Sequence, residues 1–492
     1  MSVPRPAVLF ASDTDDAGRR ALARAAARGE LLRLTAGVYT SEVADPTGAT
    51  LRHLWKIIAH AMPGAVITDR SIADGGIGSD GVVFVCSPTR ERPLTLPGIT
   101  VWPRRGPGAV DGDMQLPDGL WLASEARGLL DNLAGRRRAG LSRTLNREDV
   151  EQRLDQVCAQ RGLAGLNRLR DHARAIAIEL GRMPQLTVLD GLIGAVLSTR
   201  PAQHLTSPAL RARAAGTPVD STRIAAFERL AGALADLAPA PLPTLPTDDG
   251  RRALLPFYEA YFSNDIEGTE FTLDEAAAIV FDGDVPDTRP ADAHDILGTY
   301  QLTSSVAEMS RVANTGEQLL DLLRQRHAAL MGGRPDSLPG QFKVRANRAG
   351  STHFVAPDDV VGTLLHGFDT GKELIDPFAR AVFLMFLVSE VHPFADGNGR
   401  IARIFMNSEL VRGGQARIII PTVYRENYLA ALRAATHTAG DDALIAVLRF
   451  AQKWTARLDW TDRPTAEADL TRTHALREAR EAENAGVRLL LP

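Results

Sequence analysis

A nearly all-apolar segment, Pro377–Val391, runs without interruption into a polar loop rich in glycine, His392–Arg400. A helix of this composition belongs in a protein interior. A second helical pattern starts where the loop ends, so the loop presents free backbone N–H groups, and such groups bind phosphate. Gly397 and Gly399 allow an anion to come close. We therefore expect a fold built around a buried helix that ends at an anion-binding loop.

The residue types in this loop suit the transfer of a phosphate-linked group to a hydroxyl. The imidazole of His392, with an ordinary pKa of about 6.5, can take a proton from a hydroxyl at neutral pH. Asp396 is a hard oxygen ligand for a Mg²⁺ ion whose other ligands are phosphate and water. We expect Asn398 to hydrogen-bond a phosphate oxygen. Arg400 and Arg403, one helical turn apart, offer their guanidinium groups to the phosphates.

The loop resembles the signature of the Fic family, HPFx[D/E]GN[G/K]R, at every fixed position, and Arg403 supplies the second arginine of the wider family pattern. The resemblance spans roughly residues 254 to 460. It implies a mainly α Fic fold and a protein adenylyltransferase, which moves AMP from ATP, with Mg²⁺, onto a Ser, Thr or Tyr hydroxyl of a target protein. His392 would be the general base. Because Thr436 stands where many relatives place an asparagine, another nucleotide or another phosphate-containing donor remains an alternative.

A second motif lies upstream, since Ser263-Asn-Asp-Ile-Glu267-Gly268 resembles the [S/T]xxxE[G/N] motif of Fic proteins with an N-terminal inhibitory helix. The segment Thr422–Asn427 matches the same pattern, but it follows the loop and is interpreted as a helix start. The resemblance implies that Glu267 forms a bidentate pair with Arg403, takes the place of a nucleotide phosphate and holds the enzyme in an off state. Related proteins also use this glutamate to remove AMP, and the sequence leaves that activity open.

The segment Lys343–Pro357 is predicted to form a hairpin, because Asn347 and Gly350 are turn formers between short β-prone stretches. In Fic proteins a hairpin at this place holds the target segment by strand addition, which needs exposed main-chain groups. An ordinary surface turn is the alternative. The residues expected at the docking edge are Thr352, His353 and Phe354.

The N-terminal part is predicted to be a small α+β domain. A helical pattern, Asp16–Arg28, precedes a hairpin pattern, Glu30–Thr40, as in a winged helix, and buried strands follow at Gly81–Cys86 and Gly98–Trp102. This order, with the stretch L-x-R-L-x-x-G-V-Y, resembles AbiEi-type antitoxin and regulator proteins. The resemblance implies DNA contact, whereas the arginines of this region can also form a solvated surface. The competing function is a DNA-binding regulator or antitoxin whose C-terminal part only senses nucleotide.

The length of 492 residues requires several domains, since single cores stop growing at roughly 250 to 300 residues. The expected division is 1–135 (α+β), 136–236 (helical scaffold), 237–250 (proline-rich linker), 251–460 (Fic domain with the inhibitory helix) and 461–492 (helical tail). A net charge of −4 gives no overall attraction to nucleic acid or anionic membranes. With two isolated cysteines, Cys86 and Cys158, and no long apolar span, we expect a cytoplasmic protein without membrane contact. Self-association stays open.

Overall fold

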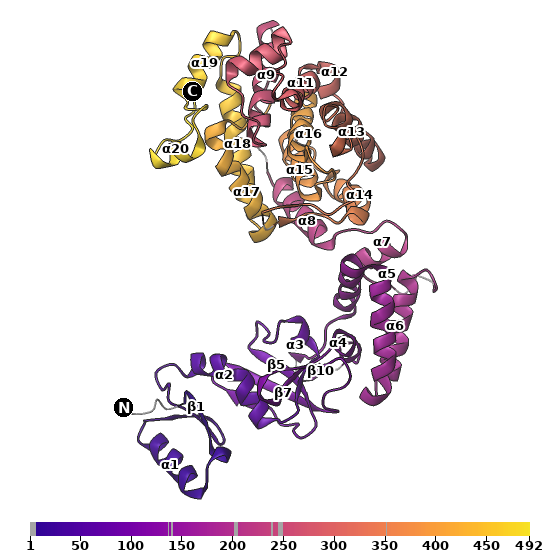
Figure 1. Ribbon diagram of the computed structural model, residues 1–492, viewed down its shortest axis with the longest axis vertical. Helices are drawn as coiled ribbons and strands as arrows, with labels where there is room; N and C mark the ends of the chain where they lie inside the picture. Colours follow the sequence, from indigo (N-terminus) through magenta and orange to yellow (C-terminus); the bar gives the residue numbers. More distant parts are fainter. Residues whose placement is uncertain are drawn as a thin grey trace. The chain divides into compact units, whose positions relative to one another are not determined.

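The structure is a computed structural model that describes residues 6–135, 137–138, 141–200, 205–237, 240–244, 249–350 and 352–492. The chain divides into two compact units, Met1–Ala214 and Ala215–Pro492 (Figure 1). The division differs from the expected one, because the last helix of the expected scaffold 136–236 belongs to the C-terminal unit. Of the expected linker 237–250, residues 238–239 and 245–248 lie outside the described residues.

The N-terminal unit begins with a three-stranded antiparallel sheet in the order β1-β3-β2 and one helix, α1 (Asp16–Ala27). The strands are β1 (Val8–Phe10), β2 (Leu32–Thr35) and β3 (Val38–Thr40). The predicted helix and hairpin are both present, but β1 is a strand that the sequence did not predict. Among residues 6–40, α1 is the one α-helix before the hairpin, so a winged helix stays a prediction.

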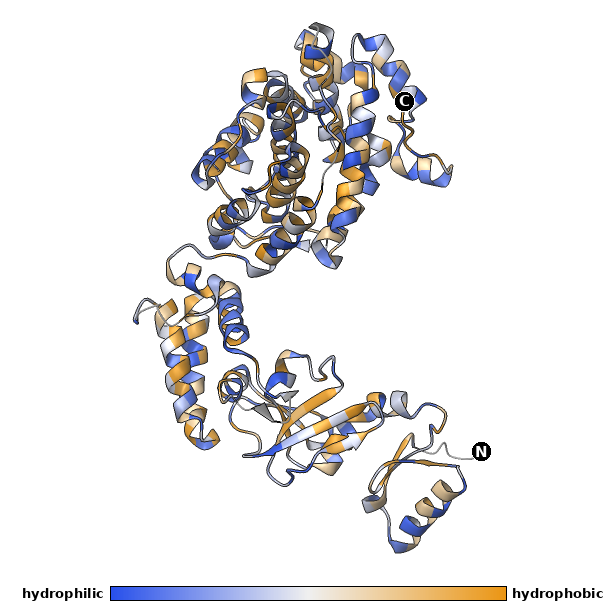
Figure 2. Ribbon diagram, turned by 180° about the vertical axis from the view of Figure 1, so that it is seen from behind, coloured by the Kyte–Doolittle hydropathy of each residue, from blue (hydrophilic) through white to orange (hydrophobic). Residues whose placement is uncertain are grey.

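A six-stranded mixed sheet follows, in the order β6-β7-β5-β4-β9-β8. Its strands are β4 (Val66–Ile67), β5 (Val82–Ser87), β6 (Leu94–Leu96), β7 (Ile99–Arg105), β8 (Met114–Gln115) and β9 (Trp121–Leu122). Every residue of β5 is buried, and the hydrophobic strands of this sheet are visible in Figure 2. Helix α2 (Pro46–Ala61) packs Ile57 and Ile58 into the same core as Val83 and Val101. The two strands predicted from the apolar runs are thus confirmed.

Helices complete the N-terminal unit. They are α3 (Arg70–Ala73), α4 (Glu125–Asn132), α5 (Arg147–Leu180), α6 (Met183–Val196) and α7 (Pro208–Ala214), with a two-residue strand pair, β10 (Arg137–Arg138) and β11 (Leu141–Ser142), after α4. Helix α5 breaks at Gly162, whose φ of 65° is readily available only to glycine. Leu154, Leu169, Ile193 and Leu210 form one core between these helices.

The C-terminal unit is mainly helical, as predicted. Its helices are α8 (Ser221–Ala235), α9 (Asp249–Ile266), α10 (Leu273–Ala277), α11 (Pro290–Ser304), α12 (Val306–Met309), α13 (Gly316–Leu330), α14 (Val360–Gly371), α15 (Pro377–Val391), α16 (Asn398–Arg412), α17 (Arg425–Thr438), α18 (Asp441–Arg457), α19 (Arg463–Arg472) and α20 (Ala479–Asn484). In α15 every residue except Pro377 and Arg380 is buried, and the helix packs against α8, α14 and α16. The apolar segment is therefore the core helix that its composition predicted (Figure 2).

The ends of the C-terminal unit join its core. Ala466, Leu470 and Leu489, from the expected helical tail, share a hydrophobic cluster with Phe257 of α9 and Trp454 of α18. The described part of the expected linker, 240–244, lies antiparallel to residues 414–416. The N–H of Thr244 donates to the carbonyl of Gly414, and the N–H of Ala416 donates to the carbonyl of Leu242. No helix in the described ranges combines the length and apolarity that crossing a lipid bilayer requires.

Candidate active site at the N-terminus of helix α16

His392 ends helix α15 in a left-handed conformation, with φ 51° and ψ 59°. Its Nδ1 lies 3.2 Å from the carbonyl oxygen of Ser389, which can only accept a hydrogen bond. Burial lowers the pKa of His392 to about 4, so the ring is neutral near pH 7. We therefore assign the proton to Nδ1 and the lone pair to Nε2. The ring of Phe354 stacks on the imidazole, with centroids 3.7 Å apart.

Two residues of the segment before the hairpin hold the loop that follows His392. The backbone N–H of Lys343 donates to the carbonyl oxygen of Pro393 at 2.8 Å, and its Nζ donates to that of Val391 at 3.2 Å. The amide of Asn347 donates to the carbonyl of Phe394 at 2.9 Å. Burial lowers the pKa of Lys343 to about 7. Lys343 was not among the predicted site residues, because a lysine in a polar segment carries no sign that it will be buried.

His327 of α13 supports the same loop and was also missed. Its Nδ1 accepts a hydrogen bond from the N–H of Gly340 at 2.9 Å, which leaves Nε2 as the donor to the carbonyl oxygen of Asp396 at 3.1 Å. Its ring stacks on that of Phe394, at a centroid distance of 3.7 Å. Burial lowers the pKa of His327 to about 4. The neutral ring thus fixes both the loop backbone and its buried phenylalanine.

Asn398 has a different orientation from the one expected. Its side-chain oxygen accepts from the N–H of Phe394 at 2.8 Å, and its amide donates to the carbonyl of Phe394 at 2.9 Å. Both ends of a buried amide are therefore used within the loop. The expected contact of this side chain with a phosphate stays a prediction, and in this conformation both of its polar atoms are used by Phe394. Asn398 instead closes the loop on itself and shapes the anion site.

Asp396 points outward from the loop, and its side chain is 54% exposed. One carboxylate oxygen accepts from the N–H of Gly397 at 2.6 Å. Among the described residues, no group of three or more His, Cys, Asp or Glu side chains could hold a metal ion. A lone, accessible carboxylate fits a Mg²⁺ ion that takes most of its ligands from phosphates and water.

Arg400 also departs from the prediction, since its side chain is only 3% exposed and faces the protein interior. Its Nη1 lies 2.5 Å from Oδ2 of Asp295 on α11 and 3.2 Å from Oδ1 of Asn264 on α9. Asp295 in turn receives the Nε of Arg334 at 2.8 Å. Nη1 is used by these internal partners, whereas Nε has no hydrogen-bond partner among the described residues. In this conformation Arg400 anchors the start of α16 to its neighbours, and its contact with phosphates stays a prediction.

Arg403 lies where the upstream motif meets helix α16. Its Nη2 donates to Oε1 of Glu267 at 2.7 Å and to the carbonyl of Ser263 at 2.8 Å, and its Nε donates to the Ser263 hydroxyl at 2.9 Å. The predicted pairing of Glu267 with Arg403 is present, but it uses one nitrogen and is not bidentate. Ser263 takes Nε and shares Nη2 with Glu267. Gly268, with φ 88°, turns the chain away directly after Glu267.

The carboxylate of Glu267 lies against the first turn of α16. A Cβ atom added at Gly399 would come within 2.2 Å of Oε1 of Glu267, so only glycine allows this approach. Gly397, at φ 73°, caps the helix in a conformation that glycine adopts without strain. Negative charge is favoured at such a helix start. The anion that the two glycines were expected to admit is, in this structure, a side chain of the protein itself.

The predicted hairpin forms from β12 (Arg348–Ala349) and β13 (Thr352–His353), which are antiparallel. Thr352 pairs its hydroxyl with Nε2 of His437 on α17 at 2.8 Å. The carbonyl of His353 accepts from Nη2 of Arg223 on α8 at 2.7 Å. Arg223 also contacts Glu390 of α15 at 2.7 Å. The three expected edge residues therefore lie beside the loop and are tied to α8, α15 and α17.

The second occurrence of the inhibitory pattern lies away from Arg403's contacts. Thr422 begins a short 3-10 turn that leads into α17, and its hydroxyl donates to Asp265 at 2.8 Å. Glu426 is exposed in the first turn of α17 beside Arg425. This segment is a helix start, as the sequence analysis proposed.

Comparison with known proteins finds a family match within the C-terminal unit. Residues 318–410 match the Fic/DOC family. Protein adenylyltransferase fic-1 of Caenorhabditis elegans is 26% identical over 184 residues, and protein adenylyltransferase Fic of Drosophila melanogaster is 27% identical over 184 residues. These alignments cover 36% of this chain. They cover 36% and 37% of the two relatives, so the chain spans little more than a third of their length.

Among solved structures, residues 134–508 of Fic-1 from C. elegans align with 69% of this chain and 98% of that chain, with 21% identity and a TM-score of 0.34. The matched residues 318–410 contain the loop, helix α15 and most of helix α16. This part of the C-terminal unit is therefore a Fic/DOC segment, similar to the protein adenylyltransferases named Fic.

Proposed function

We propose that this protein is an adenylyltransferase that transfers AMP from ATP to a Ser, Thr or Tyr hydroxyl of a target protein. The observation that supports this most strongly is the side-by-side placement of a neutral imidazole, His392, and an anion site at the start of α16. In the proposed step, the hydroxyl oxygen forms a bond to the α-phosphorus and the bond to the bridging oxygen of pyrophosphate breaks. Pyrophosphate then leaves with the electron pair of that bond.

His392 is the proposed general base for the attacking hydroxyl. Its Nδ1–H faces the Ser389 carbonyl, so the lone pair on Nε2 can accept the hydroxyl proton. The pKa of about 4 keeps the ring in its base form at neutral pH, although burial under Phe354 makes it a weak base in the resting state. Movement of Phe354, as a target segment docks on the hairpin, would expose the imidazole and raise its basicity.

The proposed nucleotide site is the first turn of α16, with Arg403 as the phosphate-binding guanidinium. The amides of α16 supply donors there, and Gly399 leaves room for an oxygen at the distance now used by Glu267. Asp396 is the residue that would hold Mg²⁺. When bound, the ion would neutralise charge on the phosphates and on the departing pyrophosphate. Asn398 and Arg400 act as positioning residues in this proposal.

Glu267 is the proposed inhibitory residue. It occupies the part of the Arg403 guanidinium and of the α16 start that a nucleotide phosphate would need, so ATP must displace it or bind in a non-reactive pose. The same carboxylate could position water for removal of AMP. A donor other than ATP remains an alternative, because Thr436 uses its hydroxyl on Glu390 and leaves no amide for the base.

Mass spectrometry of lysate proteins treated with the Glu267→Gly form and Mg²⁺ tests this proposal. Parallel reactions with ATP, GTP, CTP and UTP identify the donor, and the His392→Ala, Glu267→Gly double variant is the control. AMP-bearing hydroxyl side chains that appear only with intact His392 support the proposal. A gel shift of promoter DNA without any modified protein would instead favour the regulator hypothesis.

A further inference from the structure

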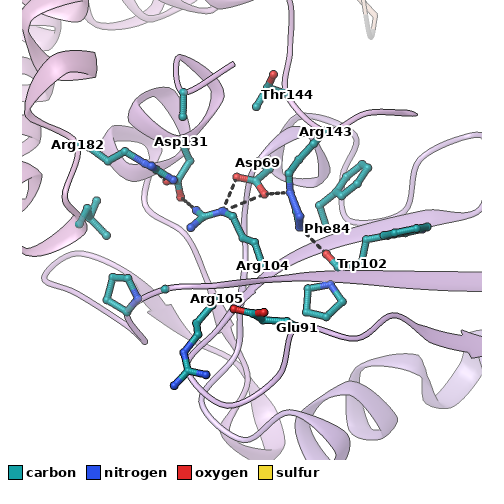
Figure 3. A pocket seen from close by; sticks show the side chains of 15 residues that line it. Asp69, Phe84, Glu91, Trp102, Arg104, Arg105, Asp131, Arg143, Thr144 and Arg182 are labelled. Atoms are coloured by element: carbon teal, nitrogen blue, oxygen red, sulfur yellow. Dashed lines mark hydrogen bonds and ion pairs between the residues drawn. The ribbon is translucent and has the colours of Figure 1, made fainter. Parts of the chain in front are cut away.

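A cavity of about 540 Å³ lies within the N-terminal unit, apart from the site proposed for AMP transfer (Figure 3). Its wall combines residues that follow β4, residues of β5 and β7, and residues around α4 and the ends of α5. The volume is in the range of sites that hold a small organic ligand. Nothing in the proposed transfer reaction uses this cavity.

Three arginines line the cavity and are held there by two buried aspartates. Arg104 donates through Nε to both oxygens of Asp69 at 3.2 Å, and its Nη2 lies 2.6 Å from Asp131. Arg143 donates through Nε to Asp69 at 2.8 Å, and Arg182 donates through Nε to Asp131 at 2.8 Å. Figure 3 shows these contacts converging on the two carboxylates.

The charges of this cluster do not cancel. The side chains of Arg104, Arg143 and Arg182 are 19%, 15% and 20% exposed, and those of Asp69 and Asp131 are 1% exposed. Behind the cavity, Arg127 and Asp113 pair with each other at 2.6 Å. Arg105 and Glu91 also line the cavity, so four guanidiniums face three carboxylates, which leaves an excess of one positive charge. A largely buried, uncompensated charge is costly, and a bound anion would offset that cost.

Several donors at the cavity have no partner among the described residues. Arg182 uses only Nε, so both of its terminal nitrogens are unbound in this part of the chain. The side chain of Arg105, at the mouth of the cavity, makes no hydrogen bond or ion pair with any described residue. Because Asp131 fixes the Nε side of Arg182, the two terminal nitrogens of Arg182 are oriented to donate to a second acceptor. Phosphate, with several oxygens, suits such a planar fork.

The remaining wall is aromatic and apolar. Trp102 is half-buried and lines the cavity together with Phe84, whose ring already receives the guanidinium of Arg143 at 5.0 Å. Pro103 and Pro107 add further apolar surface. Asp69, at the centre of the charge network, has φ 54° and ψ −141°, a conformation that costs energy for a residue with a side chain. Such strain concentrates at ligand-binding and catalytic positions.

We propose that this cavity binds a small ligand that joins a phosphate group to a planar ring, as a mononucleotide does. The phosphate would lie against the terminal nitrogens of Arg182, with Arg105 at the mouth of the cavity adding positive charge, and the ring would lie against Trp102. The site is separate from helix α16, so the N-terminal unit would sense a nucleotide independently of the transfer reaction.

Isothermal titration of the full chain with AMP and with inorganic phosphate, in EDTA, tests this proposal. The chain carries Arg403→Ala, which removes the proposed phosphate contact at α16. We expect one AMP site, weakened at least tenfold by Arg182→Ala and by Arg105→Ala. Arg161→Ala is the matched control, because Arg161 is an exposed arginine of the same unit that pairs with Glu125, and it should leave AMP affinity unchanged. Trp102→Leu should weaken AMP but not phosphate.

Three results would overturn the proposal. The first is an absence of AMP binding at millimolar concentration in the Arg403→Ala chain. The second is AMP binding that persists in both Arg182→Ala and Arg105→Ala. Arg105→Ala changes an exposed side chain, so a loss of AMP binding in that variant cannot be attributed to misfolding. The third is tighter binding of a 5′-phosphorylated oligonucleotide than of AMP, which would assign the cavity to a nucleic-acid end.

Discussion

Replacing Glu267 with glycine removes the carboxylate that contacts Arg403 and leaves Ser263 as the partner of that guanidinium. A hydrogen bond between charged groups contributes roughly 1.5 to 3 kcal/mol. The Glu267 side chain is 33% exposed, so we take the lower half of that range, about 1.5 to 2 kcal/mol. If ATP must break this contact to reach Arg403, its loss tightens ATP binding by roughly 10- to 30-fold, since 1.4 kcal/mol corresponds to a factor of ten.

The assay is equilibrium binding of ATP with Mg²⁺ to wild type and Glu267→Gly, followed by the rate of self-modification with labelled ATP. The chain offers its own control, because Glu426 lies in the second copy of the pattern and contacts only Arg425 among the described residues. Glu426→Gly should bind ATP as wild type does. The reasoning is refuted if ATP affinity and labelling of Glu267→Gly stay within twofold of wild type, or if Glu426→Gly gives the same gain.

Four further predictions concern the same site. His392→Ala in the Glu267→Gly background should abolish transfer while ATP binding changes less than threefold, as measured by titration and labelling. Gly399→Ala in that background should weaken ATP binding at least tenfold. The added Cβ would lie 2.2 Å from the present position of Oε1 of Glu267, which is the space proposed for a phosphate oxygen. Asp396→Asn should raise the Mg²⁺ concentration for half-maximal labelling several-fold without changing the nucleotide preference. Imidazole NMR should find His392 titrating at a pKa of about 4, with the neutral form present above that pH. Phe354→Ala should raise this pKa toward 6.5, because it relieves the burial of the imidazole. An unchanged pKa in Phe354→Ala would contradict the covering role of Phe354.

Most of the correct predictions from the sequence came from local patterns of residues. The loop 392–400, the helix before it and the hairpin near Gly350 were predictable, because each depends on residues close together in the chain. The contact between Glu267 and Arg403 joins distant segments, and it was implied only by the family resemblance of the two short motifs.

Contacts between distant segments were not predictable from those patterns. Arg400 turns inward because Asp295, on α11, offers a buried carboxylate that no local motif announces. Asn398 closes on Phe394 because the loop leaves two backbone groups unpaired there. Arg223 reaches the hairpin because α8 packs against α14 and α15 rather than joining the N-terminal helices. Strand β1 was missed because three apolar residues near a chain end carry too little periodicity to predict a strand.

The origin of the transferred phosphorus tests the central claim most directly. The Glu267→Gly chain is incubated with Mg²⁺ and ATP labelled at either the α or the γ position, with the His392→Ala double variant beside it. We expect that protein retains α label alone, that released pyrophosphate carries the γ label, and that the double variant stays unlabelled. Label transferred from the γ position, or equal α labelling without His392, would exclude AMP transfer by His392.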